Sequence, residues 1–357
     1  MRRLTAVRPA DKPTSERGAI SVIVAIMLVV LLGSAAVAVD VGVMYSEHSQ
    51  LQSGADAAAI GMAQKCARKA TDTLCSTTST LAATLADQNA LDGMSNVRSI
   101  ALDTTTRKVT VNTTAKGNGA PADSVSLYFA DVLGIPTAKV GASASAAWGS
   151  PKAGRTAFPL AFSICQVKDN IDGGLQLLQD HGQNANADCN YGPSGAAVDG
   201  GFGWLVQDAG KCGGTIDLAV SEGGSDPGNN APGNCSDTLN GWAKDINAGR
   251  DVIVLLPVFD KVTGTGNGAI YGLTAFAAFK VTGWKFSGGD GKGLDDSSLP
   301  YTFHNLTSTT TGVTKTTECK GSCRGIIGKF VTYVSLADGF TLGPVNAFGA
   351  TIVRLTL

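Results

Sequence analysis

The amino-acid sequence predicts an α+β protein with a single amino-terminal transmembrane helix extended into a juxtamembrane helix, then a small α+β unit and a larger β-rich, disulfide-stapled outer domain. Three observations support this prediction. Residues 19–39 contain no charged side chain, a helical pattern follows them without a break, and the remainder combines cysteines with short apolar segments between glycines. A chain of 357 residues that is 43% hydrophobic is long enough for two folded units.

The charge composition excludes one class of partner. Lys and Arg number 28 against 29 Asp and Glu, and the formal net charge is −1. A protein that binds nucleic acid through its phosphates needs a basic surface, so we expect no nucleic-acid partner. The low charged fraction of 16% and the 45 glycines favour an exported, loop-rich β protein.

The apolar run at residues 19–39 reads AISVIVAIMLVVLLGSAAVAV. A bilayer core of about 30 Å needs about 20 apolar residues in a helix, and the backbone must be helical there because lipid offers it no hydrogen-bond partner. The run follows five basic and two acidic residues. Positive flanks stay on the cytoplasmic side. We therefore expect a cytoplasmic basic tail at residues 1–18 and a transmembrane helix at 19–39, with the remainder of the chain extracytoplasmic.

A cleaved signal peptide is the alternative for this run. Ser34, Ala35, Ala36 and Ala38 are small residues of the kind that a signal peptidase accepts. The run is longer, however, than the apolar region of a signal peptide, which is about 7–15 residues. We expect an uncleaved, single-pass anchor in the cell membrane with the lipid bilayer as its surroundings.

The helical pattern continues through residues 40–70, which we interpret as a juxtamembrane helix. Spacings of three and four place one set of residues on a common face: Met44, His48, Leu51, Ala55, Ala58 and Met62. Gly54, Gly61 and the alanines between them would let a neighbouring helix approach closely. Two interpretations remain open for this face, namely packing on the chain's own outer domain and self-assembly with other copies of the chain. Glycines at 33, 42 and 54 could kink the rod.

Residues 16–64 resemble the amino-terminal region of TadG-like proteins of the Flp/Tad pilus-assembly system. The resemblance lies in Arg17-Gly18-Ala19, the apolar run, Ala38-Val39-Asp40-Val41-Gly42, Tyr45 and Leu51-Gln52-Ser53-Gly54-Ala55-Asp56-Ala57-Ala58-Ala59. It implies a membrane-anchored envelope protein that takes part in pilus assembly or anchoring through protein contacts. The partners implied are other Tad/Flp membrane proteins or pilus subunits, without catalysis and without a cofactor.

The sequence lacks two features found in related proteins, and their absence limits the roles that the resemblance implies. Pilins of these systems carry Glu five residues after the processing Gly, and the corresponding residue after Gly18 is Ile23. This difference argues against polymerisation as a major pilin. Some TadG relatives carry a von Willebrand factor A-like domain with a D-x-S-x-S metal site, and this sequence has no such run.

The first outer unit is predicted at residues 71–150, as a helix packed on a small antiparallel sheet. Its predicted elements are a helix at 80–92, a hairpin of 97–102 with 108–112, a helix at 124–133 capped by Asp123, and a strand at 137–148. Gly149-Ser150-Pro151-Lys152 is the expected boundary.

The β-rich domain is predicted at residues 151–357. Its strand candidates are 252–259, 269–286, 326–336 and 351–357, with a flexible turn at 261–268. We expect Pro257 to lie at a sheet edge and Gly272 and Gly283 to mark bends. The last strand should be docked in a sheet. Residues 169–250 are rich in Gly, Asn and Asp and need covalent staples to stay folded.

An even number of cysteines in an exported chain favours disulfides. The eight candidates are Cys66, Cys75, Cys165, Cys189, Cys212, Cys235, Cys319 and Cys323. They allow 105 pairings, of which a bridge from Cys66 to Cys75 is the one we expect. No C-x-x-C pair is present, so neither a metal site nor a thioredoxin-type redox site is expected, although Cys319 and Cys323 could form a redox pair.

No catalytic motif appears in the sequence. It contains neither a G-x-S-x-G elbow nor a phosphate-binding G-x-x-x-x-G-K-[ST] loop, and its three histidines (His48, His181 and His304) are scattered. We therefore expect no enzyme. Four aromatic residues belong either to the core or to a glycan-binding surface: Phe202, Trp204, Trp242 and Trp284. The alternative function is accordingly a cell-surface adhesin or a glycan- or protein-binding module tethered by the transmembrane helix.

Overall fold

The computed structural model describes residues 16–116, 121–167, 170–171, 173–179, 202–220, 222–225, 231–264, 268–286, 300–321, 323–335, 339–346 and 349–356. The chain forms two compact units. Unit 1 comprises residues 1–61, 77–101 and 110–144, and unit 2 comprises 62–76, 102–109 and 145–357. The fold is α+β, as predicted, with a long amino-terminal helix followed by a β-rich region. The predicted domain boundaries themselves remain predictions.

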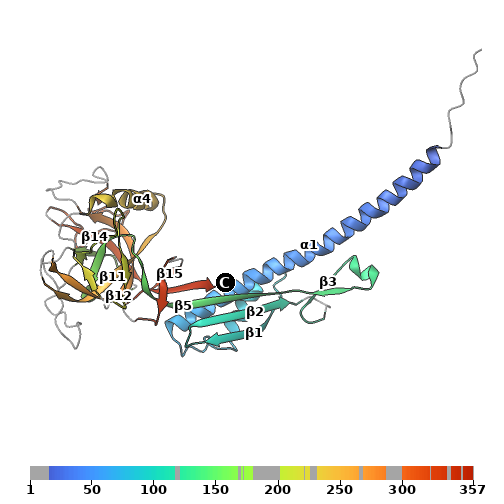
Figure 1. Ribbon diagram of the computed structural model, residues 1–357, viewed down its shortest axis with the longest axis horizontal. Helices are drawn as coiled ribbons and strands as arrows, with labels where there is room; N and C mark the ends of the chain where they lie inside the picture. Colours follow the sequence, from blue (N-terminus) through green and yellow to red (C-terminus); the bar gives the residue numbers. More distant parts are fainter. Residues whose placement is uncertain are drawn as a thin grey trace, which may run out of the picture. The chain divides into compact units, whose positions relative to one another are not determined.

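Helix α1 spans Glu16–Arg68 as one continuous element, so the predicted transmembrane and juxtamembrane helices form a single helix (Figure 1). None of the glycines at 33, 42 and 54 interrupts it. The side chains of its apolar part are exposed, and Leu31, for example, is 68% exposed. Ser34 Oγ is satisfied within the helix by the carbonyls of Val30 and Leu31.

Helix α2, Thr80–Gln88, packs against the juxtamembrane part of α1. A Cβ added at Gly54 would lie 3.2 Å from both Cα and O of Ala86. The small residues of α1 therefore allow α2, a helix of the same chain, to pack closely against it. Helix α2 ends earlier than the predicted helix at 80–92, because Asn89 caps it and Gly93 adopts a positive φ of 67°.

The strands of unit 1 lie along α1 (Figure 1). Strands β1 (Ser95–Asp103) and β2 (Lys108–Ala115) form the predicted hairpin, and the sheet continues to β5 (Gly141–Arg155) in the order β1-β2-β5. A short ribbon of β3 (Ser124–Ser126) and β4 (Thr137–Lys139) extends from it. Leu51 of α1 is buried in one cluster with Ala115, Val125, Leu127 and Val140.

Two predictions for this unit are wrong. The predicted helix at 124–133 is strand β3 followed by a single 3-10 turn, η1, at Ala130–Leu133. Val125 and Leu127 alternate into the cluster with Leu51, which favours an extended backbone. The predicted strand at 137–148 is divided into β4 and β5, and β5 continues through Pro151 to Arg155.

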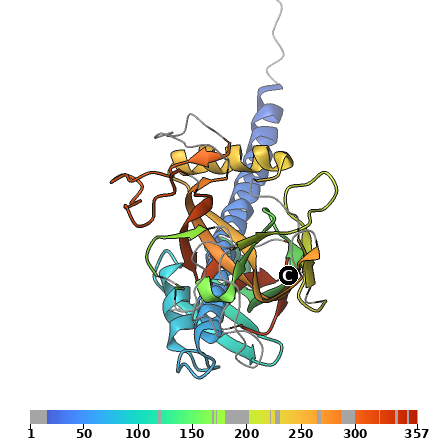
Figure 2. The same cartoon turned by 90° about the vertical axis from the view of Figure 1, so that its left-hand side faces the viewer.

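Unit 2 is built on a larger sheet in the order β7-β14-β12-β11-β6-β8. The helices and strands of unit 2 that follow β5 are β6 (Leu160–Ser163), α3 (Ile164–Val167), β7 (Gln176–Gln179), β8 (Phe202–Trp204), β9 (Thr215–Asp217), β10 (Glu222–Gly224), η3 (Gly233–Cys235), α4 (Ser236–Asn247), β11 (Val252–Thr263), β12 (Ile270–Lys285), β13 (Thr302–Phe303), β14 (Gly325–Val331), β15 (Tyr333–Ser335), β16 (Thr341–Gly343) and β17 (Thr351–Thr356). Of these, β9, β15, β16 and β17 belong to the sheet that contains β5. Figure 2 shows α4 beside the strands, and its Leu239 and Trp242 belong to their core.

The β11–β12 hairpin is the centre of this sheet. The register of the β11–β12 pairing shifts next to Gly272, and that of the β12–β14 pairing shifts next to Gly283, the two positions where bends were predicted. The prediction for Pro257 is wrong, because β11 lies between β12 and β6 and is not an edge strand. Strand β6 pairs with β11 only at Val258 and Phe259, so Pro257 lies just before that contact begins. The carboxy-terminal strand β17 is docked between β5 and β15, as predicted.

The cysteines form bridges in both the helical and the β-rich parts. Cys66 is joined to Cys75, as expected, and the structure also joins Cys212 to Cys235 and Cys319 to Cys323. Cys165 is disulfide-bonded as well, and Cys189 lies outside the described residues. A bridge that closes a loop as short as that from Cys66 to Cys75 contributes about 2–3 kcal/mol in the chain-entropy account.

The close approach of α2 predicts different effects for two glycine substitutions. Gly54→Val places atoms against the backbone of Ala86 and should destabilise unit 1 by about 1–3 kcal/mol. Gly42→Val is the matched control, because nothing lies within 4 Å of a Cβ at Gly42. Thermal unfolding of the full chain in detergent measures both. Equal stability of the two variants would contradict the α1–α2 packing.

Candidate functional site

The carboxylate of Asp40 forms the most distinctive contact of unit 1. Asp40 is the first charged residue after the apolar run, and it is only 5% exposed. Its oxygens accept hydrogen bonds from three successive backbone N–H groups: Tyr128 at 2.8 Å, Phe129 at 3.1 and 3.2 Å, and Ala130 at 2.6 Å. We call Asp40 and these three N–H groups the Asp40 clamp.

Hydrogen bonds within the loop between β3 and β4 fix the positions of those N–H groups. Leu127 N–H donates to the Pro136 carbonyl at the base of the loop, and Ile135 N–H donates to the Ala130 carbonyl. Gly134 ends η1 with a φ of 79°, a conformation that a side chain disfavours. The loop is therefore closed on itself, and the N–H groups just before η1 and at its first residue remain available to the Asp40 carboxylate.

Two opposing effects act on the pKa of Asp40. Desolvation raises the pKa, whereas the hydrogen bonds from Ala130, Phe129 and Tyr128 lower it, and the net result is a pKa below the usual value. A carboxylate that accepts several backbone N–H bonds is stabilised in its charged form. The Asp40 clamp is therefore fully charged at neutral pH.

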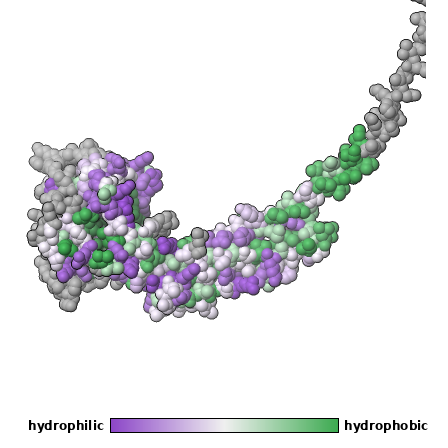
Figure 3. Space-filling model, viewed as in Figure 1, coloured by the Kyte–Doolittle hydropathy of each residue, from purple (hydrophilic) through white to green (hydrophobic). Residues whose placement is uncertain are grey.

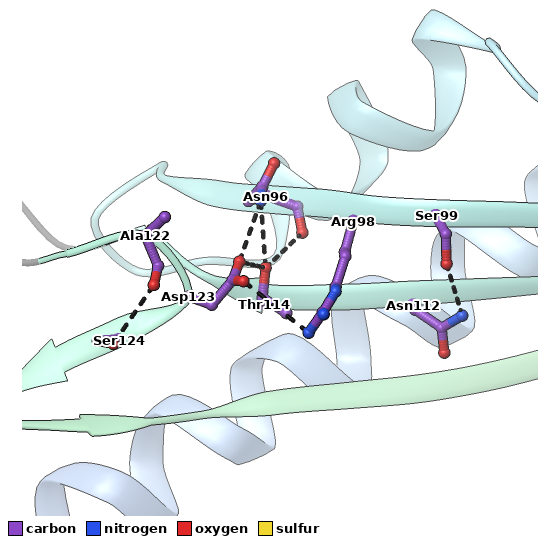
Figure 4. Close-up of polar contacts among 8 residues, drawn as sticks. All are labelled: Asn96, Arg98, Ser99, Asn112, Thr114, Ala122, Asp123 and Ser124. Atoms are coloured by element: carbon purple, nitrogen blue, oxygen red, sulfur yellow. Dashed lines mark hydrogen bonds and ion pairs between the residues drawn. The ribbon is translucent and has the colours of Figure 1, made fainter.

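A second polar group holds the base of the β3–β4 ribbon (Figure 4). Asp123, just before β3, accepts hydrogen bonds from Thr114 Oγ1 at 2.6 Å and Asn96 Nδ2 at 3.3 Å, and it pairs with Arg98 at 3.9 Å. Asp123 has a φ of 65°. The Thr114 hydrogen bond is the first of several contacts that lower the pKa of Asp123. The ribbon is thus fixed at its base to β1 and β2 and at its far end to α1.

Polar contacts also join α1 to the sheet beyond the clamp. Thr113 Oγ1 donates to the Leu51 carbonyl at 2.9 Å, and His48 Nδ1 donates to the Gly141 carbonyl at 3.0 Å. Gln52 Nε2 contacts the Ser143 carbonyl at 3.3 Å. These contacts fix the rotation of α1 about its own axis against the strands.

The predicted helix face lies largely inside the molecule. Leu51, Ala55, Ala58 and Met62 are each at most 2% exposed, whereas Met44 is half-buried and His48 is exposed. The chain's own residues cover most of this face.

The other predicted site residues are dispersed. Trp204, Trp242 and Trp284 are at most 8% exposed and belong to the core of unit 2, so these three indole rings do not form a glycan-binding surface. His304 stacks on Phe303. His181 and the Phe202 side chain lie outside the described residues.

Among the described residues, no group of three or more His, Cys, Asp and Glu side chains is arranged to hold a metal ion. A hollow of about 350 Å³ in unit 2 is lined in part by Glu222, Asp260 and Lys261. Desolvation raises the pKa of Asp260. The other described lining residues are Val220, Thr263, Ile270, Gly272, Leu273 and Thr274.

The comparison with protein families concerns the segment that contains the clamp. Residues 18–64 match the family model described as Putative Flp pilus-assembly TadE/G-like. The match confirms the resemblance drawn from the sequence. No curated protein and no solved structure matches the chain.

The TadE/G-like segment coincides with one structural element. It covers the apolar part of α1, Asp40, and the juxtamembrane part that packs on α2 and on the strands. The clamp itself was not anticipated in the sequence, where Asp40 marks only the end of the apolar run. The sequence signal for it is a single acidic residue directly after that run, since a carboxylate there requires hydrogen-bond donors if it is buried.

The depressed pKa of Asp40 predicts how the clamp depends on pH. Its stabilisation is fully present above the unfolded-state pKa of about 3.9 and is lost as the pH falls through the lower folded-state pKa. Asp40→Ala should reduce the hydrogen-exchange protection of the amides of Tyr128, Phe129 and Ala130 at neutral pH by about ten-fold or more.

Asp131→Ala is the matched control, because it removes an exposed charge of the same loop without removing an acceptor from these amides. Protection factors corrected for the intrinsic exchange rate at each pH give the comparison. Unchanged protection in Asp40→Ala would show that the clamp does not hold the loop.

Proposed function

We propose that the protein is a single-pass, membrane-anchored envelope protein that takes part in Flp/Tad-type pilus assembly or anchoring through protein contacts, without catalysis. The observation that supports this proposal is the TadE/G-like match over residues 18–64. The match falls on the helix that would join the bilayer to the outer units, so the family-specific part of the chain is the anchor and its rigid continuation.

Membrane anchoring is supported by the physical properties of α1. It is long and apolar enough to cross a bilayer, and the chain itself buries none of its most apolar stretch. The hydroxyl of Ser34 is satisfied by helix carbonyls, which suits a segment surrounded by lipid. The basic residues that precede the span favour a cytoplasmic amino terminus.

The cysteine bridges support the same orientation. The disulfides at Cys66–Cys75, Cys212–Cys235 and Cys319–Cys323 all follow the apolar run. Disulfides persist in oxidising surroundings and are rare in the cytosol. An extracytoplasmic carboxy-terminal part is therefore consistent with the bridges, and its partners would be other Tad/Flp membrane proteins or pilus subunits.

Deleting the gene in its own host tests this function. The proposal predicts that the mutant lacks assembled pili in electron micrographs and that the full-length chain supplied in trans restores them. As a control, production of the major pilus subunit should persist in the mutant.

The opposite result has a specific meaning. If pili are intact in the mutant and only its attachment to surfaces is reduced, the protein is a tethered binding module and not an assembly component. If neither pili nor attachment changes, both functions are excluded.

A further inference from the structure

The loop held by the Asp40 clamp carries a group of exposed apolar side chains. We call this group the apolar tip: Tyr128 at 71%, Phe129 at 46%, Val132 at 85%, Leu133 at 80% and Ile135 at 55% exposure. Figure 3 shows hydrophobic surface at this end of unit 1, near the hydrophobic part of α1. Contiguous exposed apolar groups of this kind mark a surface that meets a protein or a membrane.

The Asp40 clamp fixes where the apolar tip lies along α1. Asp40 directly follows the apolar run at residues 19–39, and the N–H groups of Phe129 and Ala130 lie within 3.2 Å of its carboxylate. The apolar tip is therefore beside the end of the stretch that would span the bilayer. An apolar surface at this level is continuous with the lipid-facing surface of the helix.

The backbone of the loop is suited to a water-poor environment. The N–H groups of residues 128–130 bond to Asp40, and those of Val132, Gly134 and Ile135 bond to the carbonyls of Phe129, Asp131 and Ala130. Unsatisfied backbone groups are what keeps most loops out of lipid. In this loop, the N–H groups of residues 128–130, 132, 134 and 135 already have acceptors within the protein.

The composition of the apolar tip matches the outer boundary of a bilayer. Tyr and Phe rings are favoured at headgroup depth, and Val, Leu and Ile side chains gain from contact with the upper acyl chains. Asp131 is the one charged residue in 128–135, and it is exposed. One carboxylate is compatible with the headgroup region, where water is present.

We propose that the apolar tip inserts into the outer-leaflet interface of the bilayer and forms a second lipid contact beside the transmembrane helix. This inference rests on the proposed membrane anchoring of α1. The occupant is lipid because the clamp sets the tip at the level where the apolar run ends, so contact with the bilayer follows from the anchor itself. A two-point contact of this kind restricts the tilt and rotation of unit 1 on the membrane.

Photo-crosslinking in reconstituted vesicles tests the proposal with the full-length chain. A benzophenone amino acid replaces one leucine at a time, and the protein is inserted into vesicles of phosphatidylcholine and phosphatidylglycerol. Leu133 reports on the apolar tip and Leu31 on the transmembrane span. Leu91 is the matched control. It is 88% exposed, and its N–H bonds to Gln50, which lies about 15 Å beyond Asp40 along α1.

The proposal predicts lipid adducts at positions 31 and 133 and no lipid adducts at position 91. Adducts at 31 without lipid adducts at 133 would overturn the proposal and leave the anchor intact. Cross-links from 133 to a second copy of the chain would overturn it in favour of a protein contact, and equal lipid adducts at 91 would show that the contact is not specific to the tip. Absence of adducts at 31 would refute membrane anchoring and the proposal with it.

Discussion

One buried carboxylate determines how the β3–β4 loop is joined to the end of the apolar run of α1. A charge that is removed from water must be hydrogen-bonded, because the cost of leaving it unpaired is large. Asp40 meets this requirement through the N–H groups of Tyr128, Phe129 and Ala130. The acceptor lies on α1 and the donors lie almost ninety residues later, so this contact joins the end of the apolar run to the β3–β4 loop of unit 1. The position of that loop along the helix is thereby fixed.

The contacts that follow the Asp40 clamp make α1 a structural part of unit 1. Leu51 is buried among residues of the strands, Thr113 bonds to the helix backbone, and Gly54 admits α2 at close range. A flexible tether would need none of these contacts. The TadE/G-like segment is therefore the helix against which α2 and the strands of unit 1 pack. In the proposed role, partners that bind the span and partners that bind unit 1 contact one continuous helix.

The features that the sequence predicted depend on neighbours close in the chain. The period of α1, its buried face, the short Cys66–Cys75 bridge and the register shifts beside Gly272 and Gly283 all follow from local patterns. The prediction of a helix at 124–133 is wrong because residues distant in the chain determine the conformation of this segment. Asp40 accepts hydrogen bonds from the N–H groups of residues 128–130, and Val125 packs in one cluster with Leu51. Similarly, β5 continues through Pro151 because β16 and β17, about two hundred residues later, pair with it. Periodicity cannot reveal such partners.

The Asp40 clamp can be measured directly in a bilayer. Solid-state NMR on the full-length chain in lipid vesicles, with ¹³C in the side-chain carboxyl of Asp40 and ¹⁵N in the backbone of Phe129 and Ala130, reports the distances between these nuclei. Hydrogen bonds with N–O distances of 2.6–3.2 Å predict a measurable dipolar coupling between the carboxyl carbon and both nitrogens. Coupling to neither nitrogen would mean that the Asp40 carboxylate is hydrogen-bonded elsewhere, and that it does not hold the β3–β4 loop at the end of the apolar run.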